Sequence, residues 1–248
     1  MPLETNIEKA SYEELRRILE WVVGRGGKQG RTPCVLVGGW AVYTYNPYIG
    51  SVDIDLVLNA RTRGRLFHWL RKERAFELWR SPERTWKGVR KRTKGGFWIH
   101  VDTASRAEIY PFEGRTETLN FDIVDGHTET RRVDSLPVPV PERALLVLFK
   151  LKAAFDRSTR LDMGTSDDPE WERGKLVKDR SDILALIDPA AGGRDLGVTF
   201  LGHSLARYPF LVPVFRQVGM DTNAVQRYGR LPRGGARLLV ENTIRLLT

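Results

Sequence analysis

The spacing of apolar positions changes partway along the chain. Early segments either alternate apolar and polar residues or are short and wholly apolar, and both patterns are typical of strands. The predicted strands are Cys34–Val37, Ser51–Leu58, Phe97–Thr103, a short segment near Ile109 and Phe121–Val124. Other early segments carry apolar residues at helical spacing. The predicted helices are Tyr12–Val23, Trp40–Tyr45 and Arg61–Ala75.

After three closely spaced prolines, at positions 137, 139 and 141, the pattern becomes helical. Helices are predicted at Glu142–Phe155 and Lys175–Ile187, followed by several shorter ones. The sequence therefore predicts an α/β (α+β) fold: a mixed sheet with helices in residues 1–136, then an α-helical domain in residues 137–248. The glycine-rich segment Gly24–Pro33 is interpreted as a linker, because it precedes a strand and contains no Walker-type motif.

Composition narrows the cellular context. No apolar run approaches the ~18 residues needed to span a bilayer, and the N-terminus is too polar for a secretory signal. A single cysteine, Cys34, excludes an internal disulfide framework and favours a reducing compartment. The four histidines do not have the spacing of a zinc site. We expect a cytoplasmic protein with no membrane partner.

The formal net charge of +9 is concentrated in one segment. Residues 61–94 contain thirteen basic and three acidic side chains, interleaved with aromatic residues. These aromatic residues are Phe67, Trp69, Phe76, Trp79 and Trp86. Such a run can be only a solvated surface, but arginine beside aromatic rings also suits phosphates and unstacked bases. The segment therefore suggests a polyanionic partner, for which RNA is the expected candidate.

Two carboxylates, Asp53 and Asp55, stand two residues apart in a predicted strand, so both side chains project from the same face. On an otherwise apolar strand they repel each other, and a divalent cation removes that conflict. Mg²⁺ prefers such oxygen ligands and commonly bridges to substrate phosphates. An edge strand with one face in water is the structural alternative.

Upstream, the predicted strand Cys34–Val37 runs into Gly38 and Gly39 and then into a helix. The start of a helix presents backbone N–H groups and the positive end of the helix dipole. Glycine also lets a phosphate approach the backbone closely. A tight turn that merely needs glycine remains possible for this half of the motif.

Together, VGGWAVYTYNPYIGSVDIDLVL resembles the signature of nucleotidyltransferases of the DNA-polymerase-β type. The resemblance implies a catalytic domain over residues 1–136 that uses an NTP and Mg²⁺, with Mn²⁺ as the alternative. It implies that Gly38, Gly39 and Ser51 bind the nucleotide. A third carboxylate is expected from a later strand, where Asp102 is preferred and Asp122 is the rival. Asp53, Asp55 and Asp102 are then the predicted metal ligands.

A second region is similar to the AbiEii-like branch of that family, which contains toxins of type IV toxin–antitoxin systems. The similarity lies in LFKLKAAFDR, residues 148–157, and in the later KDRSDIL, residues 178–184. It implies that Lys150, with Lys152 as the alternative, contacts the triphosphate. It also implies that Asp179 and Asp182 orient that lysine or the acceptor. A snorkelling lysine and an ordinary exposed ion pair are the structural alternatives.

The expected function is thus Mg²⁺-dependent transfer of a nucleotide from an NTP to an acceptor hydroxyl, with pyrophosphate leaving. RNA, tRNA above all, is the expected acceptor, and a cognate antitoxin is a conceivable partner. Two alternatives stay open: the same chemistry on a protein or small-molecule acceptor, and a nucleotide- or RNA-binding module without turnover. Carboxylates alone would also allow a metal-dependent phosphohydrolase.

Overall fold

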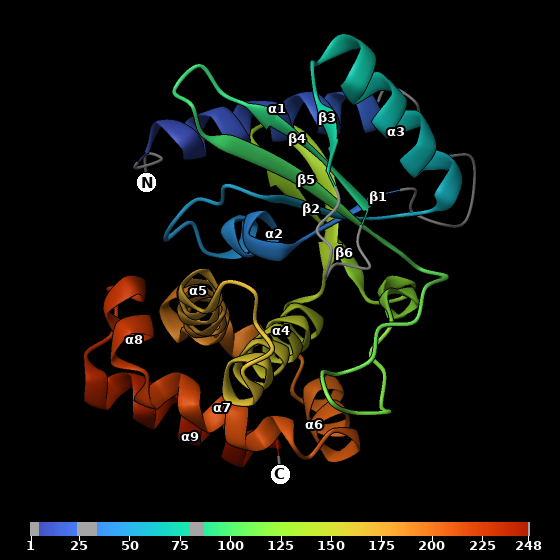
Figure 1. Cartoon of the computed structure of the whole chain (residues 1–248). Helices are drawn as coiled ribbons and strands as arrows, with labels where there is room; N and C mark the ends of the chain where they lie inside the picture. Colours follow the sequence, from blue (N-terminus) through green and yellow to red (C-terminus); the bar gives the residue numbers. More distant parts are fainter. Residues whose placement is uncertain (1–4, 24–33, 80–86, 248) are drawn as a thin grey trace. The chain divides into compact units, whose positions relative to one another are not determined.

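A computed structural model describes residues 5–23, 34–79 and 87–247 of the chain (Figure 1). The predicted linker Gly24–Pro33 and the side chain of Trp86 lie outside the described residues. The chain forms two compact units. The first contains Met1–Glu108 and Asn120–Pro141, and the second contains Ile109–Leu119 and Glu142–Thr248.

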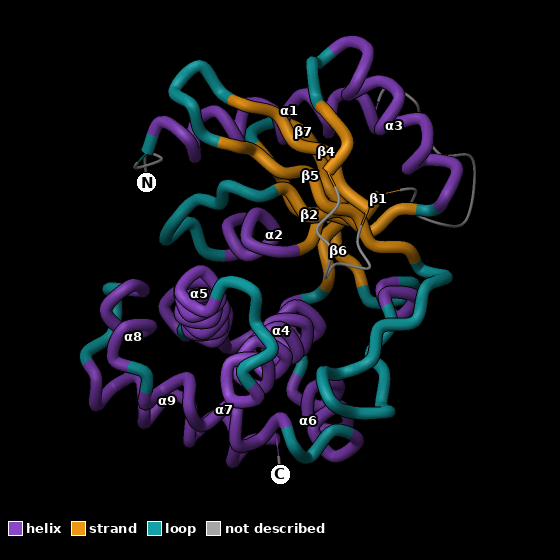
Figure 2. Tube along the Cα trace, in the orientation of Figure 1, coloured by secondary structure: helices purple, strands orange, loops and turns teal. Residues whose placement is uncertain are grey.

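The first unit is built on a five-stranded mixed sheet with the strand order β1-β2-β5-β4-β3. The strands are β1 (Cys34–Val37), β2 (Ile54–Leu58), β3 (Glu77–Trp79), β4 (Lys87–Arg92) and β5 (Trp98–Ser105). Strands β2 and β5 run parallel, and the other neighbours are antiparallel. A separate hairpin consists of β6 (Thr128–Val133) and β7 (Leu136–Pro141). Figure 2 shows both sets of strands in orange.

Helices α1 (Asn6–Val23), α2 (Gly38–Tyr45) and α3 (Ala60–Glu73) accompany this sheet. The strand β2 supplies Ile54, Leu56 and Leu58 to the core, all fully buried. Alternation in a strand puts these three side chains on one face and leaves Asp55 on the other. The core also contains Leu15 and Ile18 of α1 and Leu66 and Leu70 of α3. Because Ile54, Leu56 and Leu58 are buried on one face of β2, Asp55 projects from the other face.

The second unit is helical. Its helices are α4 (Arg143–Met163), α5 (Pro169–Ile187), α6 (Val198–Arg207), α7 (Leu211–Met220), α8 (Thr222–Tyr228) and α9 (Arg233–Leu247). Two short 3-10 helices, η2 (Pro189–Ala191) and η3 (Gly193–Asp195), follow α5. Helix α4 ends at Gly164, whose φ of +66° is the usual C-terminal left-handed cap. The segment 109–119 packs on α4, where Phe112 meets Phe155 edge-on at 5.8 Å between ring centroids.

The predicted fold class is confirmed: a mixed sheet with helices is followed by an α-helical region. Two predicted strands are wrong, however. Phe121–Val124 forms a 3-10 helix, η1, and near Ile109 only an isolated bridge joins Pro111 to Thr118. The alternation in Phe121–Val124 is thus accommodated by a 3-10 turn that buries Val124, and the segment near Ile109 pairs at a single position. In the described part of the chain, no helix is long and apolar enough to cross a membrane.

The prolines that mark the predicted boundary are part of β7 instead. Alternate residues of a strand direct their N–H groups to the same side, so prolines at 137, 139 and 141 all occupy one side. Val138 and Val140 between them are fully buried and keep their N–H groups for pairing with β6. The first unit therefore extends to Pro141, five residues beyond the predicted boundary at 136.

Candidate active site

Two of the predicted aspartates lie directly opposite each other on neighbouring strands. In the parallel pair formed by β2 and β5, Asp55 is in register with Asp102. Paired residues of adjacent strands have backbones about 5 Å apart, so their side chains leave the same face at close range. Asp102 is 3% exposed, whereas Asp55 is half-buried. The sheet thus brings two carboxylates from residues 47 positions apart to one place.

The turn at Gly38 lies against the carboxylate of Asp55. Helix α2 begins at Gly38, immediately after β1, and Gly38 has a φ of +68°. A β-carbon at this position would overlap with the carboxylate of Asp55. At the N-cap position, Val37 makes no side-chain hydrogen bond to the first turn of the helix. The first turn of α2, where backbone N–H groups favour negative charge, therefore begins beside the carboxylate of Asp55.

Asp53 lies in the bend just before β2, and its side chain is 20% exposed. Its Oδ1 is 3.4 Å from Nδ1 of His100, which stands two residues before Asp102 on β5. Ser51 is 5% exposed, and its hydroxyl donates to the backbone oxygen of Asp53 at 3.2 Å. Ser51 thus supports the bend that carries Asp53, and the nucleotide contact predicted for it stays a prediction.

The three carboxylates do not form a ready metal cage. Within residues 5–23, 34–79 and 87–247, no three acidic, histidine or cysteine side chains are grouped to hold a metal ion. Asp53 is directed toward His100, and Asp55 toward the Gly38 turn. The donor chemistry nevertheless fits Mg²⁺, because all three side chains offer carboxylate oxygens. Rotation about the side-chain torsions would be needed for them to share one cation.

Two residues of this site were missed by sequence reasoning. The alternation that selects Asp102 also selects His100, because both point from the same face of β5. Gly88 pairs with Asp102 across β4 and β5, and a β-carbon there would lie 2.5 Å from Asp102 Oδ1. Only the pairing of β4 with β5 reveals Gly88, because β4 has too few apolar residues to be recognised as a strand from its sequence.

The residues predicted from the second motif belong to a buried ion cluster in the helical unit. Lys150 of α4 lies 2.8 Å from Asp179 Oδ1 and 2.7 Å from Asp182 Oδ2, both on α5. Arg157 Nε donates to the other Asp179 oxygen at 2.9 Å, and Lys178 pairs with Asp182 at 3.0 Å. The lysine and the two aspartates predicted from this motif therefore lie together and form ion pairs with one another.

The electrostatics of this cluster favour the charged forms of Lys150, Asp179 and Asp182, whereas burial lowers the pKa of Lys178. Burial alone would lower the pKa of Lys150, but Asp179 and Asp182 raise it above its ordinary value. Burial would likewise raise the pKa of both carboxyls, but Lys150 and its neighbouring cations lower them. Lys152, the alternative lysine, donates to Asp156 and to the backbone oxygen of Pro111, each at 2.6 Å.

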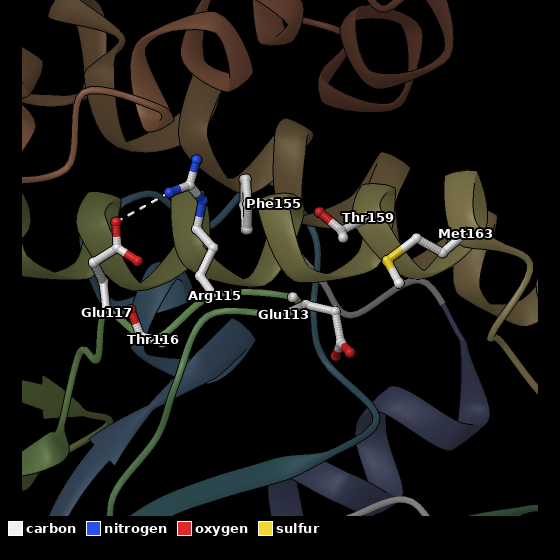
Figure 3. Close-up of a pocket in the computed structure, with 8 residues that line it drawn as sticks. Glu113, Arg115, Thr116, Glu117, Phe155, Thr159 and Met163 are labelled. Carbon is white, nitrogen blue, oxygen red and sulfur yellow. Dashed lines mark hydrogen bonds and ion pairs between the residues drawn. The ribbon is translucent and has the colours of Figure 1, made fainter.

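A shallow pocket of about 570 Å³ lies elsewhere in the helical unit (Figure 3). Residues 113–117 and helix α4 line it, and Arg115 pairs with Glu117 at 3.0 Å across its edge. The Arg115 guanidinium also covers the ring of Phe210 at 3.8 Å. The pocket contains none of the aspartates or glycines predicted for the active site. We therefore do not assign the chemistry to it.

Comparison with known proteins gives a structural similarity and no sequence match. No protein-family model matches the sequence, and no curated protein matches it. The structure is similar to that of an antigenic nucleotidyltransferase-like protein from Paracoccidioides brasiliensis. The two share 14% identity over 75% of this chain and 78% of that chain, with a TM-score of 0.41.

The contact between Gly38 and Asp55 makes a first prediction. Gly38→Ala is expected to lower the free energy of unfolding by at least about 1 kcal/mol, because alanine is strained at positive φ and its β-carbon overlaps with the Asp55 carboxylate. Gly64→Ala on α3 is the matched control, since a β-carbon there meets nothing within 4 Å and alanine favours a helix. Urea unfolding measures both. Equal stability of Gly38→Ala and the wild type would contradict the close approach.

Proposed function

We propose that this protein is a nucleotidyltransferase that moves a nucleotide from an NTP to an acceptor hydroxyl. The observation that carries the proposal is the position of the Gly38 turn against Asp55, with Asp55 in register with Asp102. An anion-binding helix start and a pair of carboxylates on one sheet face are what a triphosphate–Mg²⁺ complex requires.

In this proposal Asp53, Asp55 and Asp102 hold Mg²⁺, with Mn²⁺ as a substitute. Such a cation polarises phosphoryl oxygens, lowers the pKa of the attacking hydroxyl and offsets charge on the leaving pyrophosphate. The backbone N–H groups at Gly38 and Gly39 bind the phosphates of the NTP. His100 positions Asp53 through the contact between its Nδ1 and Asp53 Oδ1. The oxygen of the acceptor forms a bond to the α-phosphorus as the bond to pyrophosphate breaks.

The proposed acceptor is RNA, and tRNA is the preferred substrate. The support is the basic segment 61–94, whose thirteen cations favour a polyanion over a cationic small molecule. The similarity to AbiEii-like proteins extends the proposal to a toxin with a cognate antitoxin. The triphosphate contact predicted for Lys150 stays a prediction, because that lysine is engaged by Asp179 and Asp182.

The test is a labelling reaction with purified protein, Mg²⁺, total tRNA and each α-labelled NTP in turn. Label is expected on RNA, and it is expected to disappear with EDTA and in an Asp53→Ala, Asp55→Ala double variant. The double variant, purified in parallel, controls for contaminating transferases. Label on protein would keep the reaction and change the acceptor. Failure of every NTP to label any acceptor would reject the proposal in favour of a binding module.

A further inference from the structure

The sheet face that carries the aspartates also carries a row of aromatic and basic side chains. Alternate residues of β5 point to the same face, so Trp98 and His100 share the face of Asp102. The register of β4 on β5 places Arg90 opposite His100 and Arg92 opposite Trp98. Strands β3, β4 and β5 lie side by side in that order (Figure 1).

Successive contacts connect this row to the candidate active site. His100, which meets Asp53, has its ring centroid 5.4 Å from that of Trp79 on β3. The guanidinium of Arg90 lies 4.5 Å from the ring centroid of Trp79 and 4.1 Å from that of Trp98. A continuous series of contacts therefore leads from Asp53 through the side chains of His100, Trp79 and Arg90 to Trp98.

We call Trp79, Arg90, Arg92 and Trp98 the aromatic–arginine strip. Its two tryptophans and Arg90 are half-buried, and Arg92 is exposed. Arg90 Nε donates to Glu77 Oε1 at 2.6 Å. Apart from the site aspartates at its end, the strip as the structure describes it therefore sets two guanidinium groups against the carboxylate of Glu77. The strip thus combines partly open ring surface with a cationic excess.

On the opposite face of β4, the side chain of Lys91 contacts helix α1. Lys91, between the two strip arginines, turns toward α1 and pairs with Glu14 at 2.9 Å. Glu14 also receives Arg74 at 3.0 Å. The β4 cations whose side chains the structure describes are therefore divided: Lys91 helps to pack the sheet against α1, and Arg90 and Arg92 lie on the aspartate face.

In the helical part of the basic segment, Trp69 packs within the first unit and away from the strip. On α3, Trp69 stacks on Trp21 of α1 at 5.5 Å between centroids, and its Nε1 donates to Glu73. Arg63 pairs with Glu108 at 3.2 Å. Within the basic segment as the structure describes it, the strip is the part that joins rings and cations to the aspartate site.

We propose that the strip binds the unpaired bases of a single-stranded nucleic acid and leads its acceptor end to the aspartates. Indole rings stack on bases whatever their sequence, and arginine contributes both stacking and phosphate contacts. Trp98 and Asp102 are four positions apart, which is roughly 13 Å along β5 and enough for a short segment of nucleic-acid strand. This inference rests on the proposed transfer reaction and identifies the class of its acceptor.

Charge and shape together favour a single strand over a duplex. In a duplex the faces of the bases are stacked on one another, so the indoles would have nothing to bind. A surface that relied on the phosphate backbone alone would need many more cations than this strip supplies. The strip therefore predicts a preference for unpaired segments, such as the end of a tRNA, over paired ones.

The test measures binding without NTP or metal, by fluorescence anisotropy of a labelled oligoadenylate RNA, with the same strand in a duplex as comparison. Trp98→Leu is expected to weaken single-strand binding about tenfold, because it keeps apolar bulk and removes stacking. Trp98→Phe is expected to restore most of it. Trp69→Leu on α3 is the matched control and is expected to bind like the wild type. A DNA strand of the same sequence distinguishes RNA from single-stranded nucleic acid in general.

The outcomes separate this inference from the transfer reaction. Strip-dependent binding without label transfer would support the strip and reject the transferase. Label transfer at the wild-type rate by Trp98→Leu would support the transferase and overturn the strip as its acceptor site. Loss of binding in Trp69→Leu, with Trp98→Leu unchanged, would also overturn it and move the surface to α3.

Discussion

Asp102→Asn is expected to lower the rate of nucleotidyl transfer by roughly 10³-fold. Asn has the same shape but lacks the charge that a metal ligand supplies. A bound cation contributes several kcal/mol of transition-state stabilisation, and about 1.4 kcal/mol corresponds to each factor of ten. Asp55→Asn should match this loss, because Asp55 is in register with Asp102 on the neighbouring strand. Initial rates of label transfer at saturating NTP measure both.

Asp122→Asn is the matched control, because Asp122 was the rival for the third carboxylate. The structure places it in the 3-10 helix η1, exposed and outside the five-stranded sheet. Its rate is therefore expected to remain within about twofold of the wild type, as for an ordinary surface substitution. A large loss in Asp122→Asn with an active Asp102→Asn would reverse the assignment. Urea unfolding of each variant separates lost chemistry from lost folding.

The site aspartates were predictable because their signal is local. Alternation around Asp55, and in the residues before Asp102, requires only that each segment be a strand, whereas Asp53 lies in the bend just before β2. The glycine turn at Gly38 is local as well, since strand, glycine and helix follow in sequence. The structure adds that these separate signals converge: a β-carbon at Gly38 would meet Asp55, and Asp55 pairs with Asp102.

The missed strands had weak or misleading local signals. The strand β4 reads KGVRKR, in which Val89 is the only large apolar residue. Gly88 lies against Asp102, Lys91 pairs with Glu14, and Arg90 and Arg92 belong to the strip. The strand β7 contains three prolines, which normally exclude a strand, and it forms because they share one side. The environments of His100 and Trp79 depend on both pairings of β4, so no local pattern could reveal them.

The resemblance around Lys150 predicted a grouping of side chains, and the structure explains that grouping by burial. Lys150 is 8% exposed, Asp179 is 5% exposed and Asp182 is 1% exposed. Two buried carboxylates need a cation between them, since burying an unpaired charge is costly. Folding of the helical unit is therefore a sufficient reason for these residues to occur together. Whether Lys150 also contacts the triphosphate is decided by comparing the stability of its variant with the KM for NTP.

Lys150→Met is accordingly expected to lower the free energy of unfolding by about 3 kcal/mol. The change leaves Asp179 and Asp182 buried with one cationic partner fewer, and removing one member of a buried pair costs roughly 3–5 kcal/mol. The remaining contacts of Arg157 and Lys178 place the effect at the lower end of that range. Chemical unfolding in urea, followed by circular dichroism, measures the loss.

Lys152→Met serves as the comparison, because Lys152 was the alternative contact for the triphosphate. Its partner Asp156 still accepts from the backbone N–H of Glu113 at 2.9 Å, so the loss of stability should be closer to 1 kcal/mol. The KM for NTP is measured on both variants at a temperature where both are folded. A raised KM with unchanged stability in Lys150→Met would show that this lysine contacts the triphosphate. Reduced stability with an unchanged KM would assign it to the fold of the helical unit.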